Sequence, residues 1–201
     1  MKPIWTALIW TVLITAIVVP IAAAAASPLL AWREPIYIAA GLAGVLAMGL
    51  MLFQPLLAGG YLPGLSVPKM RWIHRIVGSV LLIAVIIHVA ALWITSPPDV
   101  VDALLFASPT PFSVWGVIAM WALFASALLV VFRRRLRLRT WRFAHTTLAV
   151  VIVSGTVAHA LLIEGTMETV SKISLSALIL AATLKTVADL RAWRILSRKK
   201  A

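Results

Sequence analysis

Four histidines are the residues of this 201-residue chain best suited to chemistry, and they form two pairs with the same spacing. His74 and His88 are 14 positions apart, and so are His145 and His159. In an α-helix, 14 residues return to within about 40° of the starting direction and rise about 21 Å. Each pair would therefore face one way, with its two imidazoles near opposite ends of a membrane-length helix.

The helices that must carry these histidines are predicted to be membrane spans. The chain is 63% hydrophobic and has no cysteine, and its mean hydropathy is +1.05. Soluble domains are nearer half apolar, so the excess must face lipid. The lack of cysteine excludes disulfides, thiolate metal sites and cysteine-ligated iron–sulfur clusters. We expect an all-α membrane protein, a six-transmembrane-helix bundle forming a single domain over residues 1–201 with no soluble domain.

Breakers rich in proline and glycine separate the predicted spans, and the pair Pro97-Pro98 is expected to lie in such a loop. The first span has a second interpretation, because Lys2, an apolar run and small residues up to Ser27 resemble a cleaved signal peptide. Either interpretation leaves the histidine-bearing helices, at about 72–95 and 143–163, unchanged. The spans are expected at about residues 4–26, 36–57, 72–95, 112–132, 143–163 and 173–190.

The basic residues predict the orientation in the membrane. The net charge of +12 is gathered in short blocks beside the spans, which fits the positive-inside rule better than nucleic-acid binding. With six spans, Lys2, the second loop, the arginine-rich loop at 133–139 and the basic residues after 190 fall on one side. Both termini are therefore expected to be cytoplasmic. The opposite loops carry mostly acidic residues: Asp99, Asp102, Glu164 and Glu168, with Arg33 and Lys172 as the basic ones.

The two histidine-bearing spans should run in the same direction, because two crossings separate equal topological states. His74 would then lie level with His145, and His88 level with His159, giving two tiers of facing imidazoles. Each tier could ligate one haem iron at both axial positions, which suits electron transfer better than gas binding. A zinc or copper site would need three or four ligands, whereas each tier offers two. Structural histidines are the remaining alternative, although ionisable residues inside spans usually serve a function.

Arginines accompany the ligands nearer the basic side. Arg71 precedes His74 by three positions, and Arg142 precedes His145 by three. With Arg75, these arginines are candidate partners of haem propionates, because a guanidinium binds a carboxylate through two donors. The alternative is that they only anchor the helix ends at the membrane surface.

Two glycines lie near the ligands on the same helices. Gly78 is one turn after His74, and Gly155 is one turn before His159. A flat macrocycle lying against a helix needs missing side chains at such positions. Close helix packing through small residues is the alternative.

The two His-x13-His helices and the Arg-Thr-Trp-Arg-Phe-Ala-His run at 139–145 resemble the ferric reductase-like transmembrane domain superfamily, over about residues 36–190. Its members include the membrane parts of ferric reductases and NADPH oxidases, and the haem subunit of a periplasmic methionine sulfoxide reductase system (MsrPQ type). The resemblance implies two haem b groups on His74, His88, His145 and His159. Larger members add a flavin- and nicotinamide-binding domain after the last span, whereas this chain resembles the small stand-alone bacterial members. FMN or FAD has no supporting motif here.

The expected function is that of a bis-haem b membrane cytochrome in the bacterial inner membrane, the electron-transfer component of an oxidoreductase. The cytoplasmic donor would be a flavoprotein, a ferredoxin or quinol, and the periplasmic acceptor would be ferric iron or a partner enzyme. Within the redox class, a haem subunit of an MsrPQ-like periplasmic reductase remains open. Two other classes also remain: a small transporter with a histidine proton relay, and an assembly subunit whose haems serve structure or sensing.

Overall fold

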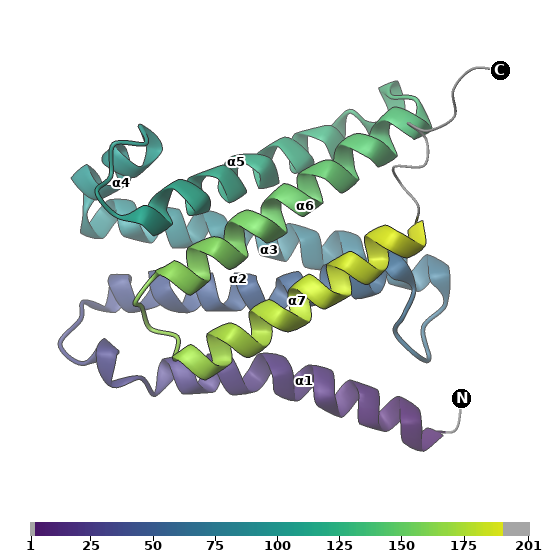
Figure 1. The fold of residues 1–201 in the computed structure, drawn as a ribbon, viewed down its shortest axis with the longest axis horizontal. Helices are drawn as coiled ribbons and strands as arrows, with labels where there is room; N and C mark the ends of the chain where they lie inside the picture. Colours follow the sequence, from purple (N-terminus) through teal and green to yellow (C-terminus); the bar gives the residue numbers. More distant parts are fainter. Residues whose placement is uncertain (1–2, 191–201) are drawn as a thin grey trace.

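Six long helices make up the bundle in the computed structural model, which describes residues 3–190 (Figure 1). All six are long and apolar enough to cross a membrane, so the predicted six-span, all-α fold is confirmed. One short α-helix and two 3₁₀ turns complete the described chain: α4 (Pro97–Leu104), η1 (Pro28–Leu30) and η2 (Arg133–Arg135). The long helices are α1 (Pro3–Ala25), α2 (Pro35–Gly59), α3 (Val67–Thr95), α5 (Pro111–Val131), α6 (Leu138–Leu162) and α7 (Thr169–Leu190).

Prolines start several helices instead of lying between them. The first turns of α2, α3 and α5 each contain one, at a position where the missing N–H has no helical partner to lose. As a result, α3 begins at Val67, before the expected start at 72. The expectation of a loop at Pro97-Pro98 is wrong, because this pair opens α4. There the Ser96 hydroxyl donates to the Asp99 carboxylate over 2.6 Å, and an acidic side chain in the first turn suits the helix dipole.

The two helices that carry histidines, α3 and α6, each pack mainly on a different neighbour and not on one another. α3 packs mainly along α2, α6 packs mainly along α5, and α7 contacts both α2 and α6. Figure 1 shows α1 beginning and α7 ending at the same end of the bundle as the α2–α3 and α5–α6 connections. We call this the arginine-rich end, after Arg133–Arg135 in the α5–α6 connection. The predicted basic residues at 2 and after 190 lie outside the described residues.

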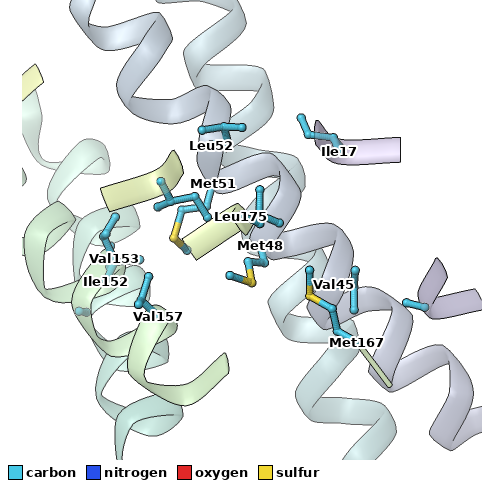
Figure 2. Close-up of a cluster of buried hydrophobic side chains, with 13 residues drawn as sticks. Ile17, Val45, Met48, Met51, Leu52, Ile152, Val153, Val157, Met167 and Leu175 are labelled. Carbon is cyan, nitrogen blue, oxygen red and sulfur yellow. The ribbon is translucent and has the colours of Figure 1, made fainter. Parts of the chain in front are cut away.

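The largest hydrophobic core joins α1, α2, α6 and α7, with Ala122 of α5 at its side. Figure 2 shows Met48 and Met51 of α2, Leu175 of α7 and the valines of α6 gathered in one cluster. Ile17 brings α1 into the same core, and a Cβ at Gly49 would lie 3.0 Å from its Cγ2 atom. α1 therefore packs closely on α2, and the choice between a retained first helix and a cleaved leader stays a prediction.

Lys172 lies inside the bundle, although the sequence predicts it in a loop. It is buried in the first turn of α7. Its Nζ donates to the Ile163 carbonyl over 2.5 Å, at the C-terminal end of α6. The last carbonyls of a helix lack helical partners and attract a cation. Lys172 therefore caps α6 and ties it to α7.

A buried hydroxyl on α7 provides a test of helix packing. Thr186 donates to the Pro55 carbonyl of α2 over 2.9 Å, whereas the buried hydroxyl of Thr183 has no hydrogen-bond partner in the described part of the chain. We expect Thr186→Val to lower the free energy of unfolding by about 0.6 kcal/mol, with a ceiling of about 1.7, as for other interhelical hydrogen bonds in membranes. Thr183→Val is the matched control and should cause no loss in a detergent-unfolding titration. Equal losses in the two variants would contradict the assigned bond.

Candidate functional site

The four histidines lie within the two helices predicted to carry them. His74 and His88 are in α3, and His145 and His159 are in α6. All four residues are half-buried. The 14-residue step separates the members of each pair by about 21 Å along the helix. We call His74 and His145, nearer the arginine-rich end, the first tier, and His88 with His159 the second tier.

The first tier has the spacing of two imidazoles that share a metal. The ring centroids of His74 and His145 are 6.2 Å apart, and the rings lie at 78° to one another. A metal–nitrogen bond of about 2 Å and about 1 Å from that nitrogen to the ring centre, taken on both sides, add to about 6 Å. In the second tier, His88 lies on α3 and His159 on α6, each 14 positions beyond its first-tier histidine. The structure therefore brings the first predicted pair together, and the pairing of His88 with His159 stays a prediction.

Every imidazole is held by a hydrogen bond at Nδ1. Three of the partners are backbone carbonyls, which can only accept, so the proton lies on Nδ1 and Nε2 is left with a free lone pair. Metal-ligating histidines use this arrangement, because the outer hydrogen bond fixes the tautomer and the ring orientation. The pairs are His74 with Gln54 O (3.3 Å), His88 with Ala40 O (2.7 Å), His159 with Phe112 O (2.9 Å) and His145 with Ser126 Oγ (3.1 Å).

The supporting residues repeat the spacing of the ligands. Ala40 and Gln54 are 14 positions apart on α2, and Phe112 and Ser126 are 14 positions apart on α5. The α2–α3 hairpin and the α5–α6 hairpin therefore present the same arrangement to one another. Sequence patterns do not reveal three of these partners, because they are backbone carbonyls, which every residue type carries regardless of its side chain.

Two glycines touch the second-tier imidazoles, and neither was predicted. A Cβ at Gly44 would lie 3.1 Å from Nδ1 of His88, and one at Gly116 would lie 2.7 Å from Nδ1 of His159. A side chain at either position would push against a ring that is already hydrogen-bonded. A sequence signal does exist: Gly44 precedes His88 by 44 positions, and Gly116 precedes His159 by 43. A comparison of the two hairpins could have found it.

The predicted glycines face the supporting helices. A Cβ at Gly78 would lie 3.6 Å from Nε2 of Gln54 on α2, and one at Gly155 would lie 2.9 Å from the Trp115 carbonyl on α5. Both glycines thus allow a histidine helix to approach its supporting helix closely. Their suggested contact with a macrocycle stays a prediction.

The predicted arginines lie exposed at the arginine-rich end. Arg71 and Arg75 are exposed on the first turns of α3. Arg142 is also exposed, and its Nη2 donates to the Leu190 carbonyl at the end of α7 over 3.4 Å. Arg142 therefore stabilises a helix end in this structure, and a role toward propionates stays a prediction for all three arginines.

Trp141 is a further site residue that the sequence did not single out for a role. Its ring stacks on the His145 ring at 5.2 Å between centroids and 9° between planes. The Arg133 guanidinium lies over the Trp141 ring, 4.6 Å from its centroid. The Trp141 Nε1 is buried without a hydrogen-bond partner among residues 3–190, so an acceptor on a bound group would satisfy it.

An apolar layer separates the two tiers. Leu81 is seven positions from both His74 and His88, and Ile152 is seven from both His145 and His159. Seven residues are close to two helical turns, so these side chains share the ligand faces. Leu81 and Ile152 are 4% and 8% exposed, so each histidine helix carries a buried apolar side chain midway between its two histidines.

The donor set limits what each tier can bind. Within residues 3–190, no group of three or more histidine, cysteine, aspartate or glutamate side chains could hold a metal ion. By the predicted pairing, each tier offers two imidazoles, one from α3 and one from α6. This fits an iron whose four other positions are filled by a macrocycle, and the orphaned Trp141 donor fits a group that carries acceptors.

Comparison with known proteins agrees with this geometry. No curated protein and no solved structure matches the chain. The family model described as "Ferric reductase like transmembrane component" matches residues 43–156, more than half of the 201 residues. The match spans α3, α5 and the first tier of histidines, and it ends three positions before His159. The chain belongs to the family of ferric reductase-like transmembrane components.

Proposed function

We propose that this protein is a membrane cytochrome that holds two b-type haems and passes electrons from a cytoplasmic donor to an acceptor on the opposite side. Membership of the family supports a membrane electron-transfer component. The single observation that carries the haem assignment is the Nδ1 hydrogen bond of all four imidazoles. With the proton on Nδ1, each Nε2 keeps a lone pair that could bond an iron.

The chain's own residues have three tasks in this function. A bound haem supplies a one-electron iron couple. His74 and His145 would ligate one iron, and His88 and His159 the other. α2 and α5 orient these rings through the carbonyls and the hydroxyl described above. Leu81 and Ile152 keep water out of the space between the tiers.

The charge distribution supports an orientation with the arginine-rich end in the cytoplasm. Exposed arginines of the α5–α6 connection lie there, together with the start of α1 and the end of α7. In keeping with the resemblance to small bacterial members, we place the protein in the bacterial inner membrane. A basic surface favours an acidic protein as donor, such as a flavoprotein or ferredoxin, over neutral quinol.

The opposite end would deliver electrons to ferric iron or to a partner enzyme. Its loops and α4 carry the four acidic residues predicted there, and all four are exposed: Asp99, Asp102, Glu164 and Glu168. These carboxylates attract cations and basic surfaces.

A proton-relaying transporter fits the site less well. A relay needs polar groups or water between its titrating residues, whereas Leu81 and Ile152 lie between the tiers. The backbone carbonyls that bind Nδ1 of His74, His88 and His159 also hold those rings in one orientation.

Haem content tests the proposed function directly. We expect protein purified from cells with an ample haem supply to contain about two haems per chain, because each of the two tiers presents a pair of axial nitrogens. Its dithionite-reduced spectrum should show the α-band of low-spin haem b, and flavin quantification should be run on the same sample. Purified, folded protein without haem would overturn the proposal.

A further inference from the structure

His145 differs from the other three histidines in what binds its Nδ1. His74, His88 and His159 each use a backbone carbonyl, which no substitution can remove. His145 uses the side-chain hydroxyl of Ser126, at 3.1 Å. Ser126 is buried on α5, 8% exposed, so no bulk water competes for this hydrogen bond.

The direction of this hydrogen bond follows from ligation. If Nε2 of His145 bonds a metal, Nδ1 carries the proton, and the Ser126 oxygen must accept it. Such a hydrogen bond makes the imidazole a more electron-rich ligand. An electron-rich ligand favours the oxidised iron and lowers its reduction potential.

The ring of His145 has a second, independent support. The parallel stack with Trp141 covers one face of the imidazole, and the Arg133 guanidinium lies over the same indole. This stack holds the plane of the ring without touching Nδ1. Removal of the Ser126 hydroxyl should therefore change the electronic state of the ligand and leave the ligand in place.

We propose that Ser126 is a positioning residue that sets the reduction potential of the first-tier haem through its hydrogen bond with His145. The inference rests on the proposed function, because it requires His145 to be an axial ligand. It also makes the two tiers chemically unequal, since only the first tier has an imidazole whose partner is a side-chain hydroxyl instead of a backbone carbonyl.

The test compares Ser126→Ala with Ser126→Thr in the full-length, haem-loaded protein. Ser79→Ala is the matched control, because Ser79 is an exposed serine of α3 whose hydroxyl donates to the Arg75 carbonyl of its own helix. Three quantities are measured: haem per chain, the midpoint potentials by redox titration, and the electron paramagnetic resonance spectrum of the ferric protein. The haem lost from His145→Ala identifies the first-tier signals.

We expect Ser126→Ala to keep two haems, to shift the first-tier midpoint potential upward and to change the first-tier resonance, with the second tier unaltered. Ser126→Thr should restore the wild-type values, and Ser79→Ala should have no effect. An unchanged first-tier potential and resonance in Ser126→Ala would overturn the inference while the wild-type haem content still supports the proposed function. Loss of the first-tier haem from Ser126→Ala would overturn it as well, by showing that Trp141 does not hold the ring. Wild-type protein without haem would refute both.

Discussion

His159→Ala is expected to leave the protein with about one haem per chain. The variant removes one of the two nitrogens of the second tier, and the chain has four histidines in all, so no spare imidazole can replace it. The first tier lies about 21 Å away along the helix and keeps both of its ligands. The remaining haem should retain its low-spin α-band. His88→Ala should give the same product, because it removes the partner ligand of the same tier.

Double variants test which histidines share an iron. His88→Ala with His159→Ala should still hold one haem, because both changes fall in the second tier. His74→Ala with His159→Ala should hold none, because each tier then lacks one ligand. Haem per chain is measured by pyridine haemochrome, and Ser79→Ala serves as the control for expression and folding. One haem in the mixed double variant would contradict the pairing of His74 with His145 and of His88 with His159.

Gly116→Ala is expected to weaken the second tier nearly as much as the loss of a ligand. The added Cβ would lie 2.7 Å from Nδ1 of His159 and 3.0 Å from its Cε1. The imidazole must then turn and lose its 2.9 Å bond to the Phe112 carbonyl. Loss of such an outer hydrogen bond typically weakens metal binding by about 10–100-fold. The second-tier haem should therefore be under-occupied after purification.

Alanine substitutions at two further glycines test whether haem loss increases as the added Cβ comes closer to the imidazole. Gly44→Ala brings a Cβ to 3.1 Å from Nδ1 of His88, a milder clash, so its haem loss should be smaller. Gly165→Ala is the control, because its Cβ would make ordinary contacts of 3.6 Å with Ile163. Haem titration into the purified apoprotein gives the affinities. Equal haem affinity in Gly116→Ala and Gly165→Ala would show that the close approach at Gly116 is unimportant for the ligand.

The spans and the placement of two histidines on each of two helices were predictable because each depends on one helix at a time. Hydropathy alone places six apolar segments, and the 14-residue step alone puts His74 and His88 on one face of α3. The pairing across tiers needed only the direction of two helices. The 6.2 Å between the rings of His74 and His145 confirms that α3 and α6 face one another in the first tier.

The helix boundaries were less predictable, because proline has two opposite roles. It interrupts a helix from within but is welcome in the first turn. Pro97 was predicted to lie in a loop, and Pro68 lies before the predicted start of the third span at 72, yet both lie in the first turn of a helix. Composition does not separate the two roles. The helix that follows must find a surface to pack on, as α4 does against α3 and α5.

The supports of the imidazoles could not be predicted from residue types. A carbonyl has the same chemistry in Ala40 as in Phe112, so only the packing of α2 on α3 and of α5 on α6 selects the one that binds. For Trp141, the residue type does carry a signal, but that signal indicates a different role. Tryptophan at a membrane surface usually anchors a helix, and only the structure shows its ring lying flat on His145.

Each histidine helix directly follows, along the chain, the helix that supports its rings. α2 precedes α3, and α5 precedes α6. We expect the α2–α3 hairpin to form first during synthesis, with the Nδ1 atoms of His74 and His88 satisfied before α5 leaves the ribosome. The second hairpin would arrive with its own rings satisfied in the same way. Biogenesis would then consist of the insertion of two formed halves and a final joining of the halves, and loading of the proposed cofactor would belong to that last step.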